Sequence, residues 1–170
     1  MLSLLLIAIL QSASALQAEH DPFAPLTLYG GTWTVKAQHP WSGGAPGTPD
    51  KLVSHCERFT SYFTCEQTVN GKTQGLIVYT AGSSPGKLNS RFVSPDGLAG
   101  GRGDVTLIGN NWTYLDKPPL TLKGKWSRVE NVILDRDHIR FEEYESSDEG
   151  KTWTETNFGT EERTVPAPAK

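Results

Sequence analysis

Apolar and polar residues alternate along most of this chain. In the first such segment, residues 28–38, Trp33 and Val35 fall on one face and the intervening Thr and Lys residues on the other. A period of two is typical of a β-strand that buries one face. Comparable short segments continue to about residue 162, separated by turns rich in Gly, Pro, Asn and Asp. The pattern predicts about eight to ten short antiparallel strands and no helix beyond the N-terminal segment.

Many sequential strands need an architecture that leaves few unpaired edges. An up-and-down barrel meets this requirement by pairing its first strand with its last, and a β-sandwich is the alternative. We therefore predict an all-β fold, a single antiparallel up-and-down β-barrel over residues 28–163. Residues 16–27 are expected to form a flexible leader and residues 164–170 a frayed tail.

Both cysteines lie in one predicted hairpin. If residues 60 and 61 form its turn, counting outward brings Cys56 directly opposite Cys65. The count also places them at a non-hydrogen-bonded pair, where two strands approach closely enough for a disulfide bond. We predict that bond, although Thr-Ser lacks the usual Gly or Asn of a tight turn and a longer loop would shift the register.

The chain begins with a segment of signal-peptide type. Residues 2–10 are nearly all apolar but too few to span a bilayer, and the small-x-small sequence Ala13-Ser14-Ala15 follows. Signal peptidases cleave after such a site, so residues 1–15 are expected to be removed, with a buried helix of the mature domain as the alternative. The protein is then expected to be exported, periplasmic or extracellular, where a disulfide bond is stable. The mature form is expected to be one domain of about 155 residues without a transmembrane segment.

Charge patterning argues against one class of partner. The formal net charge is −3, and the chain from Asp135 onward holds ten acidic and five basic residues. Nucleic-acid binding requires Lys and Arg residues gathered on one face, which is the opposite arrangement. No nucleic-acid partner is expected, and the oligomeric state is left open.

Two tryptophans are candidate ligand-binding residues. The segment 39–49 contains three prolines and three glycines, which exclude helix and strand and predict a long exposed loop. Trp41 lies within this loop and is a candidate lid over a ligand. Trp33 lies on the apolar face of the first predicted strand.

One predicted strand, residues 138–145, carries a row of functional groups. A period of two puts His138, Arg140, Glu142 and Tyr144 on the same face. If this face points into the barrel, Arg140, Glu142 and Tyr144 can orient the polar end of a ligand, and with His138 they can perform acid-base chemistry. Alternatively, the face is solvated and pairs with the neighbouring strand.

The motifs give little support for catalysis or metal binding. Residues 82–86 match the G-x-S-x-G pattern of serine hydrolases, but the residue after the serine is Pro85, which has no N–H for an oxyanion hole. Histidines and cysteines show no close His-x-His or Cys-x-x-Cys spacing, so no metal site and no cofactor are predicted. A haem ligated by one histidine, with His138 as the candidate, is the alternative.

Several motifs in combination resemble a known group of barrels. Gly31-Thr32-Trp33 is similar to the G-x-W sequence of the calycin superfamily, the lipocalin-like barrels. With the cysteine hairpin, the segment 111–114 (NWTY) and the Asp-box-like segment 148–153, the chain resembles a bacterial family of secreted calycin-like proteins of unknown function. The resemblance implies a barrel with an interior and a Trp33 that packs across one end. It implies no established activity.

The expected function is ligand binding without catalysis. A barrel with this supply of aromatic residues favours a small, partly apolar ligand, with Trp33, Trp41, Arg140, Glu142 and Tyr144 as the candidate contacts. Two alternatives remain. One is an enzyme that acts on a small molecule with the polar row of residues 138–144 inside the barrel, and the other is an envelope interaction protein whose barrel is filled with side chains.

Overall fold

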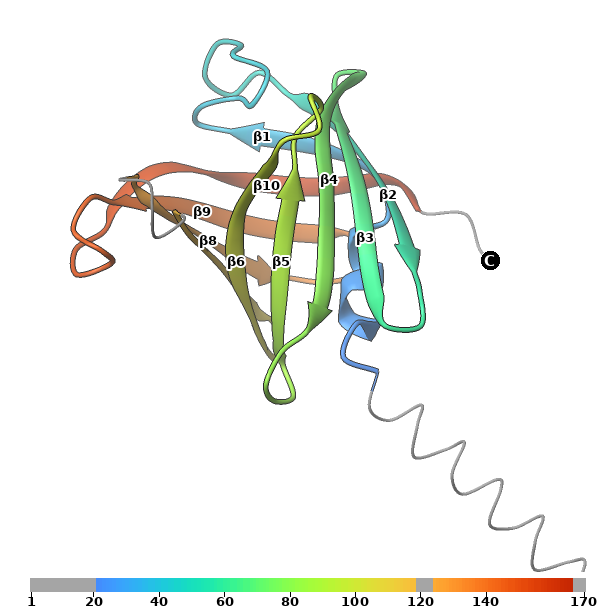
Figure 1. Cartoon of the computed structure of the whole chain (residues 1–170). Helices are drawn as coiled ribbons and strands as arrows, with labels where there is room; N and C mark the ends of the chain where they lie inside the picture. The colour runs from blue at the N-terminus through green and yellow to red at the C-terminus, as the bar shows by residue number, and fades with distance from the viewer. Residues whose placement is uncertain (1–20, 119–123, 167–170) are drawn as a thin grey trace, which may run out of the picture.

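Ten antiparallel strands close on themselves in chain order (Figure 1). The computed structural model describes residues 21–118 and 124–166. Each strand pairs with its neighbours in sequence, and β1 pairs with β10, which completes the barrel. The elements are η1 (Ala24–Tyr29), β1 (Gly31–Ala37), β2 (Asp50–Arg58), β3 (Tyr62–Val69), β4 (Lys72–Ala81), β5 (Lys87–Val93), β6 (Ala99–Ile108), β7 (Asn111–Lys117), β8 (Trp126–Ile133), β9 (His138–Ser146) and β10 (Thr154–Pro166). The predicted all-β, antiparallel up-and-down barrel is confirmed.

Tight turns set the register of the strands. Asn70 and Gly71 connect β3 to β4 with positive φ angles of 51° and 77°, the conformation that an Asn-Gly turn accommodates. In the preceding hairpin Cys56 pairs directly with Cys65, and their Cα atoms lie 4.1 Å apart. The predicted register and disulfide bond are confirmed, so the hairpin is a cross-linked part of the barrel wall.

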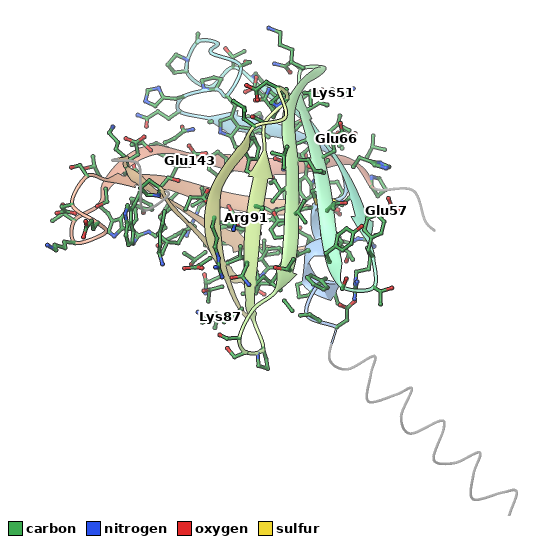
Figure 2. All side chains as sticks on the ribbon, viewed as in Figure 1. Lys51, Glu57, Glu66, Lys87, Arg91 and Glu143 are labelled. Carbon is green, nitrogen blue, oxygen red and sulfur yellow. A yellow bond between two sulfur atoms is a disulfide. The ribbon has the colours of Figure 1, made fainter. Side chains whose placement is uncertain are left out.

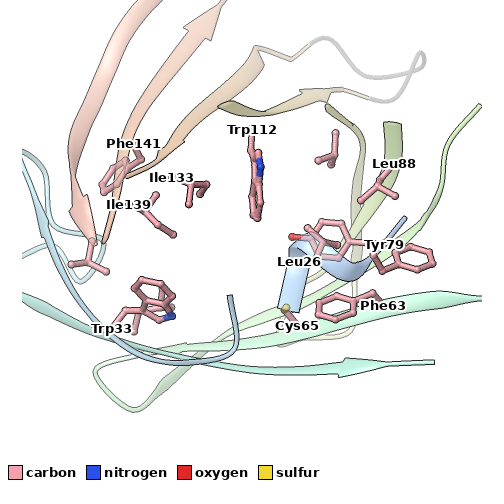
Figure 3. Close-up of a cluster of buried hydrophobic side chains, with 14 of the residues drawn as sticks. Leu26, Trp33, Phe63, Cys65, Tyr79, Leu88, Trp112, Ile133, Ile139 and Phe141 are labelled. Carbon is pink, nitrogen blue, oxygen red and sulfur yellow. The ribbon is translucent and has the colours of Figure 1, made fainter. Parts of the chain in front are cut away.

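The 3-10 helix η1 closes one end of the barrel. Its Leu26 and the preceding Phe23 are 0% and 2% exposed. Figure 3 shows Leu26 among the buried side chains that the strands contribute. Arg58 holds the start of this segment from outside, 4.6 Å from the Phe23 ring centroid and 3.2 Å from an Asp21 carboxylate oxygen. The flexible leader was therefore a wrong prediction for residues 21–27, because burial of two large apolar side chains offsets the entropy of ordering them.

Trp33 and Arg163 fasten η1 to the strands. Trp33 is fully buried, and its Nε1 donates a hydrogen bond to the backbone oxygen of Tyr29 at 3.1 Å. The guanidinium of Arg163 lies 4.1 Å from the centroid of the Trp33 ring. It also donates hydrogen bonds to the backbone oxygens of Leu28 and Gly30. One cation thus joins β10, β1 and the end of η1.

The last strand extends further than the sequence indicated. Gly31 pairs with Pro166 and Thr32 pairs with Val165. Residues 164–166 therefore belong to β10 and not to a frayed tail, because β1 gives them backbone partners. The expected signal peptide, residues 1–15, lies outside the described residues, as do residues 16–20 and 167–170.

In the described part of the chain, no helix has both the length and the apolar character needed to cross a membrane.

Replacement of Arg163 tests the closure of this end. We expect Arg163→Ala to lower the free energy of unfolding by about 2 to 4 kcal/mol, because the variant loses a buried cation–π contact and charged hydrogen bonds. Arg140→Ala, which removes a guanidinium from the exposed outer face, is the matched control and should change it by about 0.5 kcal/mol or less. Urea unfolding measures both, and equal stability of the two variants would contradict this role.

Candidate functional site

A cavity of about 220 Å³ lies inside the barrel. Five aromatic side chains line it: Tyr29, Trp41, Tyr79, Tyr114 and Phe141. Three carboxyl groups also line it, those of Asp116, Glu143 and Glu161, whereas no Lys, Arg or His among residues 21–118 and 124–166 does so. Leu52, Cys65, Gln67, Ile77, Val129 and Asn131 complete the wall. The wall of the cavity is therefore largely apolar and includes three acidic side chains.

The face of β9 that points into the barrel carries Ile139, Phe141 and Glu143. It is the opposite face from the row that begins with His138. Ile139 and Phe141 are buried in the core, and Glu143 follows them on the same face and lines the cavity. Burying two large apolar side chains stabilises this orientation by roughly 25 cal/mol for each Å² removed from water. The choice of the inward face follows from Ile139 and Phe141.

Arg140, Glu142 and Tyr144 consequently lie on the outer face of the barrel. The structure does bring them together, since the Tyr144 hydroxyl donates to Glu142 Oε2 at 2.7 Å and Arg140 Nε lies 4.0 Å from Glu142 Oε1. Arg140 and Glu142 line a second, more open pocket with Lys36 and Phe158. The suggestion that this row points into the barrel is wrong, and the interpretation of a solvated outer face holds.

His138 begins the same outer row. Its side chain is exposed, and Nδ1 lies 2.8 Å from Asp135 Oδ1. The candidate haem ligand therefore lies outside the cavity. Among the residues that the structure describes, no three His, Cys, Asp or Glu side chains gather closely enough to hold a metal ion.

Tyr29 brings a polar group from η1 into the cavity. Its hydroxyl accepts hydrogen bonds from the Tyr114 hydroxyl at 2.9 Å and from Asn131 Nδ2 at 2.7 Å. With Nδ2 used in this way, Asn131 Oδ1 has no hydrogen-bond partner among the described residues, although Asn131 is only 7% exposed. A buried acceptor without a partner is rare in a protein core, and the side chain that carries this one lines the cavity.

Glu161 supplies a second buried acceptor. It reaches the cavity from β10 and is 6% exposed. Within the described residues its carboxyl group accepts no hydrogen bond. Burial, with a smaller contribution from the charge of Glu143, raises the pKa of Glu161 to about 7. The group therefore changes its charge near neutral pH.

Trp41 covers the end of the cavity opposite η1. Its Nε1 donates to Glu143 Oε1 at 3.1 Å, and its ring lies 5.5 Å from that of Phe141 between centroids. It remains 37% exposed, as expected for a side chain between cavity and solvent. Trp41 lines the cavity, and its role as a lid over a ligand stays a prediction. Trp33 lies at the η1 end and does not line the cavity. It contributes indirectly, because its hydrogen bond to the Tyr29 backbone holds η1 in place.

Two buried polar residues hold the loop of Trp41 in place. Asn157 forms a pair of hydrogen bonds with the backbone of His39, at 2.9 and 3.0 Å. Asp50 accepts from the backbone N–H of Ser42 at 3.1 Å and from Asn70 Nδ2 at 2.8 Å. Burial alone would raise the pKa of Asp50, but these hydrogen bonds outweigh it and lower the pKa below its usual value. The loop is therefore anchored on both sides of Trp41.

Comparison with known proteins adds no family to this description. No protein-family model matches the chain, and a search of curated proteins finds no match. The closed ten-strand barrel is consistent with a calycin-like fold, while membership of the bacterial calycin-like family stays a prediction.

The sequence did not identify the inward polar groups. Tyr29 was expected to lie at the start of the first strand, and Glu161 and Asn131 stand in ordinary alternating segments. Of these groups, Glu143 had a sequence signal for an inward position, because it lies on the same strand face as the apolar Ile139 and Phe141.

Glu161→Gln should change the pH dependence of stability. The native carboxyl keeps its proton up to about pH 7, whereas the unfolded chain releases it near pH 4.3, so wild-type stability falls between these values. We expect the variant to match the wild type near pH 4.5 and to exceed its free energy of unfolding by about 3 kcal/mol at pH 8.

Urea unfolding at both pH values measures this difference. Glu162→Gln, at the neighbouring exposed position, is the control and should show no such pH-dependent gain. A difference between Glu161→Gln and wild type that is the same at pH 4.5 and pH 8 would count against an unpaired buried carboxyl.

Proposed function

We propose that the protein is a non-catalytic barrel that binds a small, partly apolar ligand in its central cavity. The observation that carries the proposal is the buried Glu161 carboxyl, which lines an aromatic cavity and accepts no hydrogen bond from the described residues. Asn131 lines the same cavity, and its buried Oδ1 has no hydrogen-bond partner among them. Small-molecule sites combine mostly apolar walls with a few placed polar groups in this way. A ligand with hydrogen-bond donors would satisfy both groups.

The size of the cavity limits the ligand. A cavity of about 150 Å³ accommodates benzene in another protein. By proportion, a cavity of about 220 Å³ holds roughly six to ten non-hydrogen atoms. The ligand, or the part of it that the cavity surrounds, is therefore compact.

Export forms part of the same proposal. The Cys56–Cys65 disulfide suits an oxidising compartment. Together with the signal-type segment of residues 1–15, it supports a periplasmic or extracellular binding protein. Figure 2 shows charged side chains such as Lys51 and Glu66 on the outside of the barrel.

The two alternatives lose their main support. The enzyme hypothesis relied on His138, Arg140, Glu142 and Tyr144 inside the barrel, and all four lie outside the cavity lining. The hypothesis of a barrel filled with side chains does not account for a cavity of about 220 Å³.

Filling the cavity tests the proposal. We expect native mass spectrometry to find a co-purified small molecule on the wild type, or uptake of indole after refolding, because the indole N–H can meet a free acceptor. Val129→Trp adds a large side chain to the cavity wall and should abolish both.

The matched control is Val132→Trp, which adds the same side chain on the alternate face of the same strand. It should retain binding. Wild-type protein with neither a co-purified molecule nor indole uptake would overturn the proposed function, and so would binding that survives Val129→Trp.

A further inference from the structure

The charged side chains that the structure places in the cavity wall are all acidic. Asp116, Glu143 and Glu161 contribute three carboxyl groups to its lining, and no basic side chain lines it in the part of the chain that the structure describes. Arg163 lies near Glu161 in sequence, but its guanidinium is bound to Trp33 and to the backbone at the η1 end. An ionised carboxylate that is buried without a partner is costly, and a cation from outside the protein would remove this cost.

We propose that the ligand is a small amine that binds as its ammonium cation, with its N–H groups directed at Glu161 and Asn131 Oδ1 and its apolar body against the aromatic wall. This inference rests on the proposed function and specifies the chemical class of the ligand. It concerns primary and secondary amines, which keep N–H donors when protonated.

The two acidic groups of β9 and β10 lie at different depths. Glu161 pairs with Ile139, near the start of β9 and towards the η1 end. Glu143 pairs with Asn157, nearer the end that Trp41 covers. Glu143 is already engaged, since its two oxygens accept hydrogen bonds from Trp41 Nε1 and Asn157 Nδ2. Glu161 is therefore the group that remains to bind a cation deep in the cavity.

At the η1 end of the cavity, the protein groups available to a ligand favour hydrogen-bond donors on that ligand over acceptors. Asn131 Oδ1 and the ionised Glu161 carboxyl can only accept hydrogen bonds, and an ammonium group supplies up to three donors. Aromatic rings in the cavity wall, among them Phe141 and Tyr79, offer cation–π contacts to the same charge. A carboxylate ligand would instead be repelled by Glu143 and Glu161.

The site should release a proton when the amine binds. At pH values below about 7 the carboxyl of Glu161 is mostly protonated, so pairing with an ammonium ion expels that proton to the buffer. Tyr29 of η1, Tyr79 of β4 and Tyr114 of β7 face the same space, and burial raises the pKa of each well above 10, so they stay neutral. Of the other acids in the lining, Glu143 lies at the end that Trp41 covers, and burial, with a smaller contribution from the charge of Asp104, raises the pKa of Asp116 above its usual value.

The test compares three ligands of one shape on the complete mature protein by isothermal titration calorimetry. The probes are 2-phenylethylamine, 2-phenylethanol and phenylacetate, which are cationic, neutral and anionic at pH 8. We expect the amine to bind at least about tenfold more tightly than the alcohol at pH 8, and phenylacetate not to bind. We also expect the affinity for the amine to fall at least about tenfold between pH 8 and pH 5.5, with proton release at pH 5.5 seen as a buffer-dependent enthalpy.

Two variants test whether Glu161 causes the preference for the amine. Glu161→Gln should remove the preference for the amine over the alcohol, and Glu162→Gln should keep it. Tighter or equal binding of the alcohol or of phenylacetate by the wild type would overturn the amine inference and leave the proposed binding function standing. A preference that survives Glu161→Gln, or no binding of the amine at all, would also overturn it, and only the additional loss of indole uptake and of any co-purified molecule would refute the proposed function.

Discussion

The contact between the Arg163 guanidinium and the Trp33 indole decides where the interior of this barrel begins. It joins the first and last strands, and its hydrogen bonds to Leu28 and Gly30 fix the end of η1. With η1 in place, the Tyr29 hydroxyl reaches Tyr114 and Asn131. The floor of the cavity therefore depends on a contact made outside it. Loss of that contact would loosen the closure of the barrel and the polar arrangement above it together.

The interior combines stabilising apolar walls with one group that works against stability. Ile139 and Phe141 turn β9 inward and thereby carry Glu143 into the cavity, where Trp41 and Asn157 bind it. Glu161 has no such partner, and its raised pKa reflects the cost of ionising it there. A purely structural barrel would gain stability from an apolar residue at this position. A buried carboxyl group in an aromatic cavity is instead typical of a ligand-binding site.

Local patterns predicted most of the wall, and contacts between distant segments determined the rest. Counting from a two-residue turn placed Cys56 opposite Cys65 because hairpin register is a local property. The η1 plug could not be found in the same way, since Phe23 and Leu26 are buried only once the strands have closed. Glu161 lies on the same face of β10 as the buried Asn157, whereas Phe158, the large apolar residue of this segment, lies on the opposite face and is 46% exposed. The pattern of apolar residues therefore does not mark the inward face of β10.

A high-resolution crystal structure of the protein as purified, at pH 8, shows directly whether the Glu161 carboxyl is available to a ligand inside the barrel. We expect electron density for a compact molecule in the cavity, within hydrogen-bond distance of Glu161 and Asn131 Oδ1 and beneath Trp41. A Glu161 side chain that points to solvent, or an interior filled by the protein's own side chains, would contradict it.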